Sequence, residues 1–250
     1  MPMMDQPAGG YRFLPGISPY SCGAVACDGF EIVHVTFQQP PAYRNGFERI
    51  AELLESLQRP QAALCGVSLR SPRPYSFRGF VDFNREYESI LETWGLFVDD
   101  INPVARTNVA PVNDPPTEPV LQGFSFTQSC PPQLPATFVV AGAGELPEGR
   151  LSREAIVALG DISADGISTK ARFVMDLMEG RLRGLGVDWP QVTRTNVYTA
   201  HSTDSVLPEI VLSRQGSAIM DGVTCHYSRP PIDEIEYEMD LRGIRTELRK

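Results

Sequence analysis

Apolar and polar positions along the chain follow helical spacing in some segments and strand spacing in others. Apolar side chains recur every three or four positions over 47–57, 82–94 and 167–186, which predicts amphipathic helices, and a short helix is predicted over 206–214. Runs rich in β-branched and aromatic residues, bounded by Gly and Pro, predict strands. These strands are expected over 22–37 (a hairpin turning at Asp28 and Gly29), 63–69, 101–111, 120–127, 137–144, 191–200, 222–228 and 235–241.

The order of these elements is the same in the two halves of the chain. Each half reads β-α-β-α-β-β, which predicts an α+β protein of two tandem domains, residues 15–127 and 128–250, with helices on one face of a mixed sheet. Residues 1–14 are polar and rich in Gly and Pro, and are predicted to be disordered. The tetrapeptide Arg-Thr-Asn-Val occurs at 106–109 and 194–197, but the element order indicates that this match is a coincidence.

Composition and charge restrict the classes of function. Hydrophobic residues make up 42% of the 250 residues, which supports a packed core, and the net charge of -9 argues against a nucleic acid or an anionic membrane as partner. No apolar run is long enough for a membrane span, and no signal peptide is recognised. The five cysteines are scattered, which favours reduced thiols in the cytoplasm over a disulfide framework. Neither they nor the three histidines have metal-binding spacing, so we expect no metal.

Arg106 is the residue that points most directly to chemistry. It stands in the strand predicted over 101–111, and alternation places Val104, Arg106 and Asn108 on one face. A guanidinium among apolar residues is costly unless an anion meets it, and its planar fork suits a carboxylate. The alternatives are a structural ion pair with one of the 31 acidic residues, or a strand edge at which Arg106 reaches water.

Several short motifs, taken in order, carry a family resemblance. They are Pro-Tyr-Ser-Cys-Gly-Ala-Val at 19–25, the helix 82–87 followed by Asn-Pro-Val-Ala-Arg-Thr-Asn-Val at 102–109, Thr-Phe-Val-Val-Ala-Gly-Ala-Gly at 137–144, and the segment 171–201. Over about residues 15–245 the chain resembles the Rid family (YjgF, reactive-intermediate imine deaminases, "endoribonuclease L-PSP" in older labels), as two Rid-like domains in tandem. The resemblance implies chorismate-mutase-like domains and hydrolysis of a small imine or enamine without a cofactor.

The same resemblance implies a set of site residues. Arg106 matches the strand arginine that grips the substrate's carboxylate, and Thr107 and Asn108 beside it would orient a water molecule. Tyr20, Asn84 and Gly142 lie in the other matched motifs and are expected to contact the substrate.

The proton donor is implied less directly. The family's acid is a glutamate on the last strand, which Glu236 matches in the second half, whereas Leu121 or Gln122 stands there in the first half. Alternation also puts Glu236 on one face with Glu238 and Asp240, as on a solvated strand face. The second half lacks the arginine in turn, since Asp221 or Gly222 stands at its position. Either the two halves form a composite site or catalysis is lost.

Three functions follow as hypotheses. The first is hydrolytic deamination of a small carboxylate-bearing imine, enamine or related C–N compound in an inter-domain cleft. The second is an inactive module that binds a small carboxylated metabolite. The third, an endoribonuclease, fits the acidic charge poorly. Because each sheet has a helix-free face that must be buried, we also expect a homo-oligomer, most simply a trimer.

Overall fold

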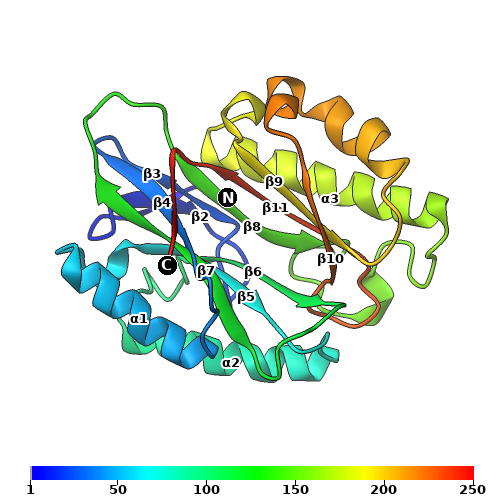
Figure 1. The fold of residues 1–250 in the computed structure, drawn as a ribbon, viewed down its shortest axis with the longest axis horizontal. Helices are drawn as coiled ribbons and strands as arrows, with labels where there is room; N and C mark the ends of the chain where they lie inside the picture. The colour runs from blue at the N-terminus through cyan, green and yellow to red at the C-terminus, as the bar shows by residue number, and fades with distance from the viewer. Residues whose placement is uncertain (1) are drawn as a thin grey trace.

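The computed structural model describes residues 2–250 and has an α+β architecture, as predicted (Figure 1). The helical segments agree closely with the apolar spacing. Ser76 caps the second helix through its side chain, and Ser163 caps the third in the same way. Gly186, in the left-handed conformation, ends the third helix. The three helices are α1 (Tyr43–Ser56), α2 (Phe77–Thr93) and α3 (Ala164–Leu185).

The strands follow the predicted order in both halves. The first half contains β4 (Phe30–Thr36), β5 (Leu64–Arg70), β6 (Ala105–Pro111) and β7 (Val120–Ser129). The second contains β8 (Phe138–Gly144), β9 (Arg194–Thr199), β10 (Thr224–Arg229) and β11 (Tyr237–Gly243). Where a short helix was predicted over 206–214, the second half has two consecutive short helical segments, η4 (Leu207–Val211) and η5 (Leu212–Arg214), followed by η6 (Gly216–Asp221). Single helical turns also occur at η1 (Gln61–Ala63), η2 (Arg153–Ala155) and η3 (Trp189–Gln191).

The two halves have the same strand order. Along the 12-stranded sheet formed by the described residues, the first half runs β6-β5-β7-β4 and the second β10-β9-β11-β8. In the first half β5 and β6 are parallel, and in the second half β9 and β10 are parallel. The other neighbours within each half are antiparallel. The Arg-Thr-Asn-Val match falls on the third strand of one half and the second strand of the other, so its interpretation as a coincidence is confirmed.

The ends of the chain correct two predictions. Residues 4–6 and 11–14 form β1 (Met4–Gln6) and β2 (Tyr11–Leu14), so the prediction of a disordered segment over 1–14 is wrong for the described residues. Tyr11 and Phe13 are fully buried and hold this segment in place. The predicted 22–37 hairpin is also absent: β3 (Gly23–Ala26) pairs with β2 and β8, whereas β4 pairs with β7 and with β12 (Thr246–Arg249).

The strand pairings of β3 and β12 mean that neither half of the sheet is formed by one continuous segment of the chain. The pairing of β3 with β8 brings first-half residues to the second half of the sheet, and the pairing of β12 with β4 does the reverse. The boundary at 127/128 therefore remains a prediction about sequence organisation. Of the helices described, none is both long and apolar enough to cross a bilayer.

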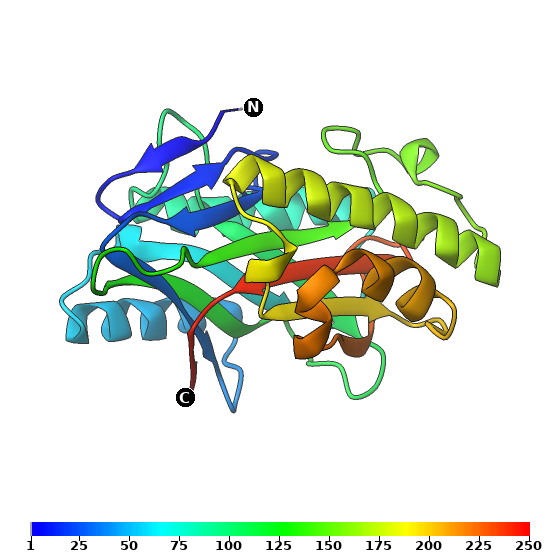
Figure 2. The ribbon, with the colours of Figure 1, turned by 90° about the horizontal axis from the view of Figure 1, so that it is seen from above.

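The molecule is built in four layers (Figures 1 and 2). Helix α3 packs on the second-half strands, and α1 and α2 pack on the first-half strands on the opposite side of the molecule. The helix-free faces of the two halves of the sheet meet in a core that includes Cys65, Ala105, Val139 and Ala141. These faces bury one another within one chain, so they need no second chain to cover them. The homotrimer stays a prediction, which a light-scattering mass compared with 27.6 kDa tests.

Candidate active site

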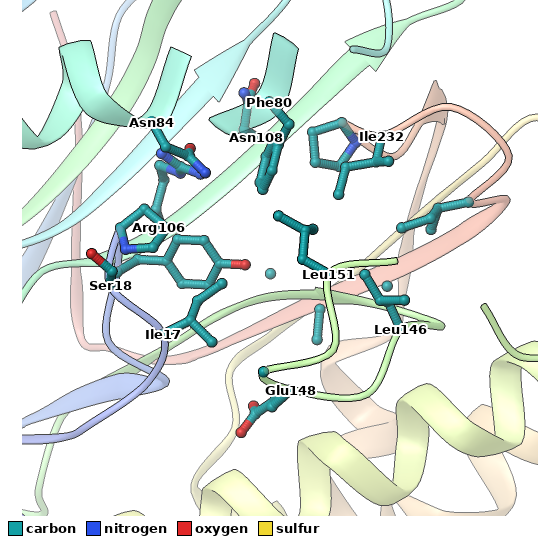
Figure 3. A pocket seen from close by; sticks show the side chains of 18 of the residues that line it. Ile17, Ser18, Phe80, Asn84, Arg106, Asn108, Leu146, Glu148, Leu151 and Ile232 are labelled. Atoms are coloured by element: carbon teal, nitrogen blue, oxygen red, sulfur yellow. The ribbon is translucent and has the colours of Figure 1, made fainter. Parts of the chain in front are cut away.

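A cavity of about 480 Å³ opens where the two halves meet (Figure 3). The first half contributes side chains from α2 and β6, and the second contributes residues from β8, the loop after it, α3 and β11. The segment before β3 supplies Ile17 to Tyr20. The walls are therefore composite, as one of the two hypotheses for the split motifs predicted.

Arg106 on β6 is buried in the wall of this cavity. Only 3% of the residue is exposed, and its guanidinium carbon lies 4.7 Å from the ring centre of Tyr87 and 4.8 Å from that of Tyr20. Its Nη2 donates to Oδ1 of Asn84 on α2 at 2.7 Å, whereas its buried Nη1 has no hydrogen-bond partner. The aromatic faces stabilise the cation but accept no directed N–H hydrogen bond from Nη1, so an acceptor is missing at this atom.

Asn108 adds a second free donor on the same strand face. Its Oδ1 accepts a hydrogen bond from Oγ of Ser71 at 2.9 Å, which orients the amide. Its Nδ2 is buried without a partner. Arg106 and Asn108 both line the cavity, so its wall contains a cation and an amide group that each have an unpaired hydrogen-bond donor. Oxygen acceptors such as those of a carboxylate are the groups that pair with donors of this kind.

Glu238 on β11 brings a carboxyl group to the same cavity. It is 4% exposed, and burial raises its pKa well above the ordinary value, with Asp240 adding to the rise while Arg106 and Arg181 oppose it. Because burial disfavours the charged form, the raised pKa favours the protonated carboxyl group, which is able to donate a proton.

Gly142 on β8 makes room for this carboxyl group. A Cβ atom at position 142 would collide with Oε1 of Glu238, so a larger residue there forces this carboxyl group to move. The β8–β11 register shifts between Met239 and Leu241, which marks a bulge beside the cavity. Bulges often redirect side chains next to functional sites.

Arg181 on α3 is a second buried cation in the wall. Its Nη1 donates to the backbone oxygen of Ala141 at 2.7 Å, and its Nη2 donates to Oε1 of Glu148 at 2.7 Å. Burial alone would raise the pKa of Glu148, but the charge and hydrogen bonds of Arg181 lower it, so Glu148 is ionised. Burial raises the pKa of the neighbouring Cys22 thiol to about 11, so Cys22 is not a thiolate at neutral pH.

Most residues predicted for the site lie in this cavity. Tyr20, Asn84, Arg106, Asn108 and Gly142 all line it. Their individual roles remain predictions, which the location in the cavity supports without testing.

Two predicted residues lie elsewhere. Thr107 points to the other face of β6, into a small space between the sheets. Glu236 precedes β11 and does not line the cavity; its Oε2 contacts Nε2 of His201 at 2.8 Å and Nη1 of Arg229 at 3.0 Å. The glutamate of this strand that lines the cavity is Glu238, two residues later. The face that carries Glu238 and Asp240 is buried between the sheets, whereas alternation alone suggested a solvated face.

Sequence reasoning missed Arg181 and Glu148. A signal for Arg181 was present, because it falls on the apolar stripe of α3 with Val174, Met178 and Leu185. Glu148 lies in an irregular loop and carries no periodic signal. Within residues 2–250, no three His, Cys, Asp or Glu side chains gather closely enough to hold a metal ion.

Comparison with solved structures gives TM-scores below 0.5 for a chorismatase and for the YjgF gene product. A chorismatase crystal structure has a TM-score of 0.46 at 12% identity, covering 89% of this chain and 77% of the chorismatase chain. The YjgF gene product from E. coli has a TM-score of 0.28 at 14% identity, covering 44% of this chain and 80% of its own. These partial likenesses do not establish two tandem Rid-like domains.

Comparison with known sequences is far more specific. The chain is 40% identical over 248 residues to the 2-amino-5-chloromuconate deaminase of Comamonas testosteroni, covering 96% of this chain and 95% of that protein. The family model described as "2-aminomuconate deaminase CnbZ" matches residues 3–248. This family is distinct from the Rid family that the motifs suggested. The chain belongs to the 2-aminomuconate deaminase CnbZ family.

Proposed function

We propose that the protein hydrolyses the C–N bond of a muconate-type amino compound and releases ammonia. Such a compound is a six-carbon diene with a carboxylate at each end and an amino group beside one carboxylate. The observation that carries the proposal is the pair of unpartnered buried donors, Arg106 Nη1 and Asn108 Nδ2, in a cavity that also holds Glu238. The 2-amino-5-chloromuconate deaminase relative and the family description support the reaction class.

The first step binds and orients the substrate. Arg106 and Asn108 hold the carboxylate next to the amino-bearing carbon, and Asn84 keeps the guanidinium in place through its 2.7 Å hydrogen bond. Binding exchanges unpaired buried donors for charge-assisted hydrogen bonds, which favours a carboxylate over a neutral group.

The chemical steps need one proton donor and one water molecule. Protonated Glu238 gives its proton to a carbon of the enamine, which becomes an iminium ion. The oxygen of water bonds to the iminium carbon, and Glu238 recovers a proton from that water, which leaves a hydroxyl and an amino group on the same carbon. The hydroxyl proton is transferred to the amino nitrogen, the C–N bond breaks, the nitrogen leaves as ammonia and the carbon becomes a carbonyl. Hydrolysis of this kind moves no net electrons, so the proposal includes no redox cofactor.

The test is ammonia release from 2-aminomuconate and 2-amino-5-chloromuconate by three variants. Arg106→Gln removes the cation, Glu238→Gln removes the proton, and Arg78→Gln is the matched control, an exposed arginine on α2 outside the cavity. Loss of the cation and of its charge-assisted hydrogen bond from Nη1 predicts that Arg106→Gln lowers kcat/KM about 100-fold. Glu238→Gln is expected to lower kcat about 100-fold or more, as for loss of a general acid.

Two results would contradict the proposal. The first is wild-type ammonia release that neither cavity variant reduces, which would place the chemistry elsewhere. The second is binding of the compound with no release of ammonia, which fits the non-catalytic binding module instead.

A further inference from the structure

Arg181 is a buried cation in the cavity that the proposed chemistry does not use. Its side chain is 7% exposed, and its Nε and Nη2 both donate to Oε1 of Glu148, at 3.1 Å and 2.7 Å. Among the described residues, Glu148 is its salt-bridge partner. The backbone oxygens of Ala141 and Gly142 accept from its Nη1 and fix its position in the wall.

Glu148 is anchored less firmly than Arg181. It belongs to the loop after β8, and its side chain is 41% exposed. Both nitrogens of Arg181 contact the single oxygen Oε1, which also accepts from Sγ of Cys22 at 3.3 Å. Fork geometry in which each nitrogen meets its own oxygen is the strong arrangement for an arginine and a carboxylate. The observed contact leaves that arrangement open to another carboxylate.

We infer that Arg181 binds the second carboxylate of a dicarboxylate substrate and that Glu148 occupies this position until the substrate arrives. This inference rests on the proposed function, in which Arg106 takes the first carboxylate. Figure 3 shows Glu148 well apart from Arg106 and Asn84, so the two cations serve different parts of the cavity. Exchange of one carboxylate for another leaves no buried charge unpaired at the end of binding.

The remaining walls suit the carbon chain of such a substrate. Leu146, Leu151, Phe80, Ile232 and Ile235 line the cavity with apolar side chains. A conjugated diene, with or without a chlorine substituent, is apolar between its carboxylates and gains from this contact. The cavity of about 480 Å³ is large enough for six carbons with two carboxylates.

Two probes that differ only at the second carboxylate test the inference. Muconate (hexa-2,4-dienedioate) carries a carboxylate at both ends, whereas sorbate (hexa-2,4-dienoate) carries one. Neither has an amino group, so both bind without turnover, and calorimetric titration gives each Kd. Wild type is expected to bind muconate at least about tenfold more tightly than sorbate.

Variants of Glu148 test whether its carboxylate competes with the substrate for Arg181 or instead helps the substrate to bind. Glu148→Gln removes the competing charge, so muconate is expected to bind about three- to tenfold more tightly while sorbate changes less than about twofold. Glu154→Gln, an exposed acid further along the same loop, is the matched control and is expected to leave both Kd values unchanged. A muconate Kd that is unchanged or weaker in Glu148→Gln would overturn the inference, as would equal affinity of wild type for the two probes.

Variants of the two arginines distinguish this inference from the proposed function. Arg181→Met is expected to erase the preference for muconate, and Arg183→Met, an exposed neighbour on α3, to preserve it. If Arg181→Met does not fold, Glu148→Gln decides the inference alone. Arg106→Gln is expected to abolish sorbate binding. Sorbate binding that does not depend on Arg106 contradicts the proposed function, whereas equal binding of both probes contradicts only the role of Arg181.

Discussion

The carboxyl group of Glu238 on β11 lies against Gly142 on β8 and fills the space that a side chain at position 142 would occupy. The role of Gly142 is therefore to leave space for the Glu238 carboxyl group, not to provide backbone flexibility. Because both line the cavity, a change at one of these positions acts directly on the other.

Gly142→Ala is expected to displace the Glu238 carboxyl group and lower kcat by at least about tenfold, since a shift of an ångström is costly for proton transfer. Steady-state ammonia release measures the effect. Gly180→Ala is the matched control: no atom lies near a Cβ there, the site is exposed in the middle of α3, and alanine should stabilise the fold by about 0.5–1 kcal/mol. Full activity in Gly142→Ala would show that the position of Glu238 does not matter.

The raised pKa of Glu238 predicts how stability depends on pH. The unfolded chain loses this proton near the ordinary glutamate pKa of about 4.3, whereas the folded protein keeps it to a higher pH. Between the two pKa values the folded state binds more protons, so stability falls as pH rises, by up to about 1.4 kcal/mol per unit for this group. Glu238→Gln removes this loss. Its Tm relative to wild type is therefore expected to be higher at pH 8 than at pH 5, and a constant difference would contradict the assignment.

Asn84 holds the Arg106 guanidinium from α2, and its loss should affect binding more than folding. Asn84→Ala leaves Nη2 of Arg106 without its 2.7 Å acceptor, so the guanidinium is less well oriented toward a carboxylate. We expect kcat/KM to fall about tenfold, the effect of one hydrogen bond to a charged group. Ser89→Ala, an exposed position on the same helix, is the control in the same assay. Equal rates for the two variants would remove Asn84 from the site.

Lys170 and Glu145 form an ion pair with no exposed side-chain surface, next to the start of β11. Nζ of Lys170 lies 3.1 Å from Oε1 of Glu145, which also accepts the backbone N–H of Glu236. Lys170→Met leaves a buried charge uncompensated and is expected to cost about 3–5 kcal/mol, measured by denaturant unfolding. Adding Glu145→Gln should recover part of this loss. If the double variant is less stable than Lys170→Met alone, the pair is not the source of the effect.

Local signals in the sequence were sufficient for most of the elements. Apolar spacing located α1, α2 and α3, and the repeated element order appears as the same strand order in both halves. A local signal of the same kind singled out Arg106, a cation within an apolar strand. Its role in binding a carboxylate stays a prediction. The Rid resemblance led to the deaminase class, although the family is a different one.

Long-range packing decided what local signals could not. Alternation correctly placed Glu238 and Asp240 on one face, but whether that face met water depended on the sheet opposite, which buries it. Glu236 was the nearer match to a motif, yet it lies before β11 and pairs with Arg229 and His201. The β8 bulge that sets Gly142 against Glu238 is a property of two strands about 100 residues apart.

The sequence by itself determined most of the elements, their order and the α+β class, because each depends on neighbours within a few positions. Only the tertiary structure decided that the helix-free faces bury one another and that Arg106, Asn108 and Glu238 share one cavity with Arg181 and Glu148. These residues come from different strands, a helix and a loop. Their convergence depends on how the two halves of the sheet cross, which no local pattern encodes.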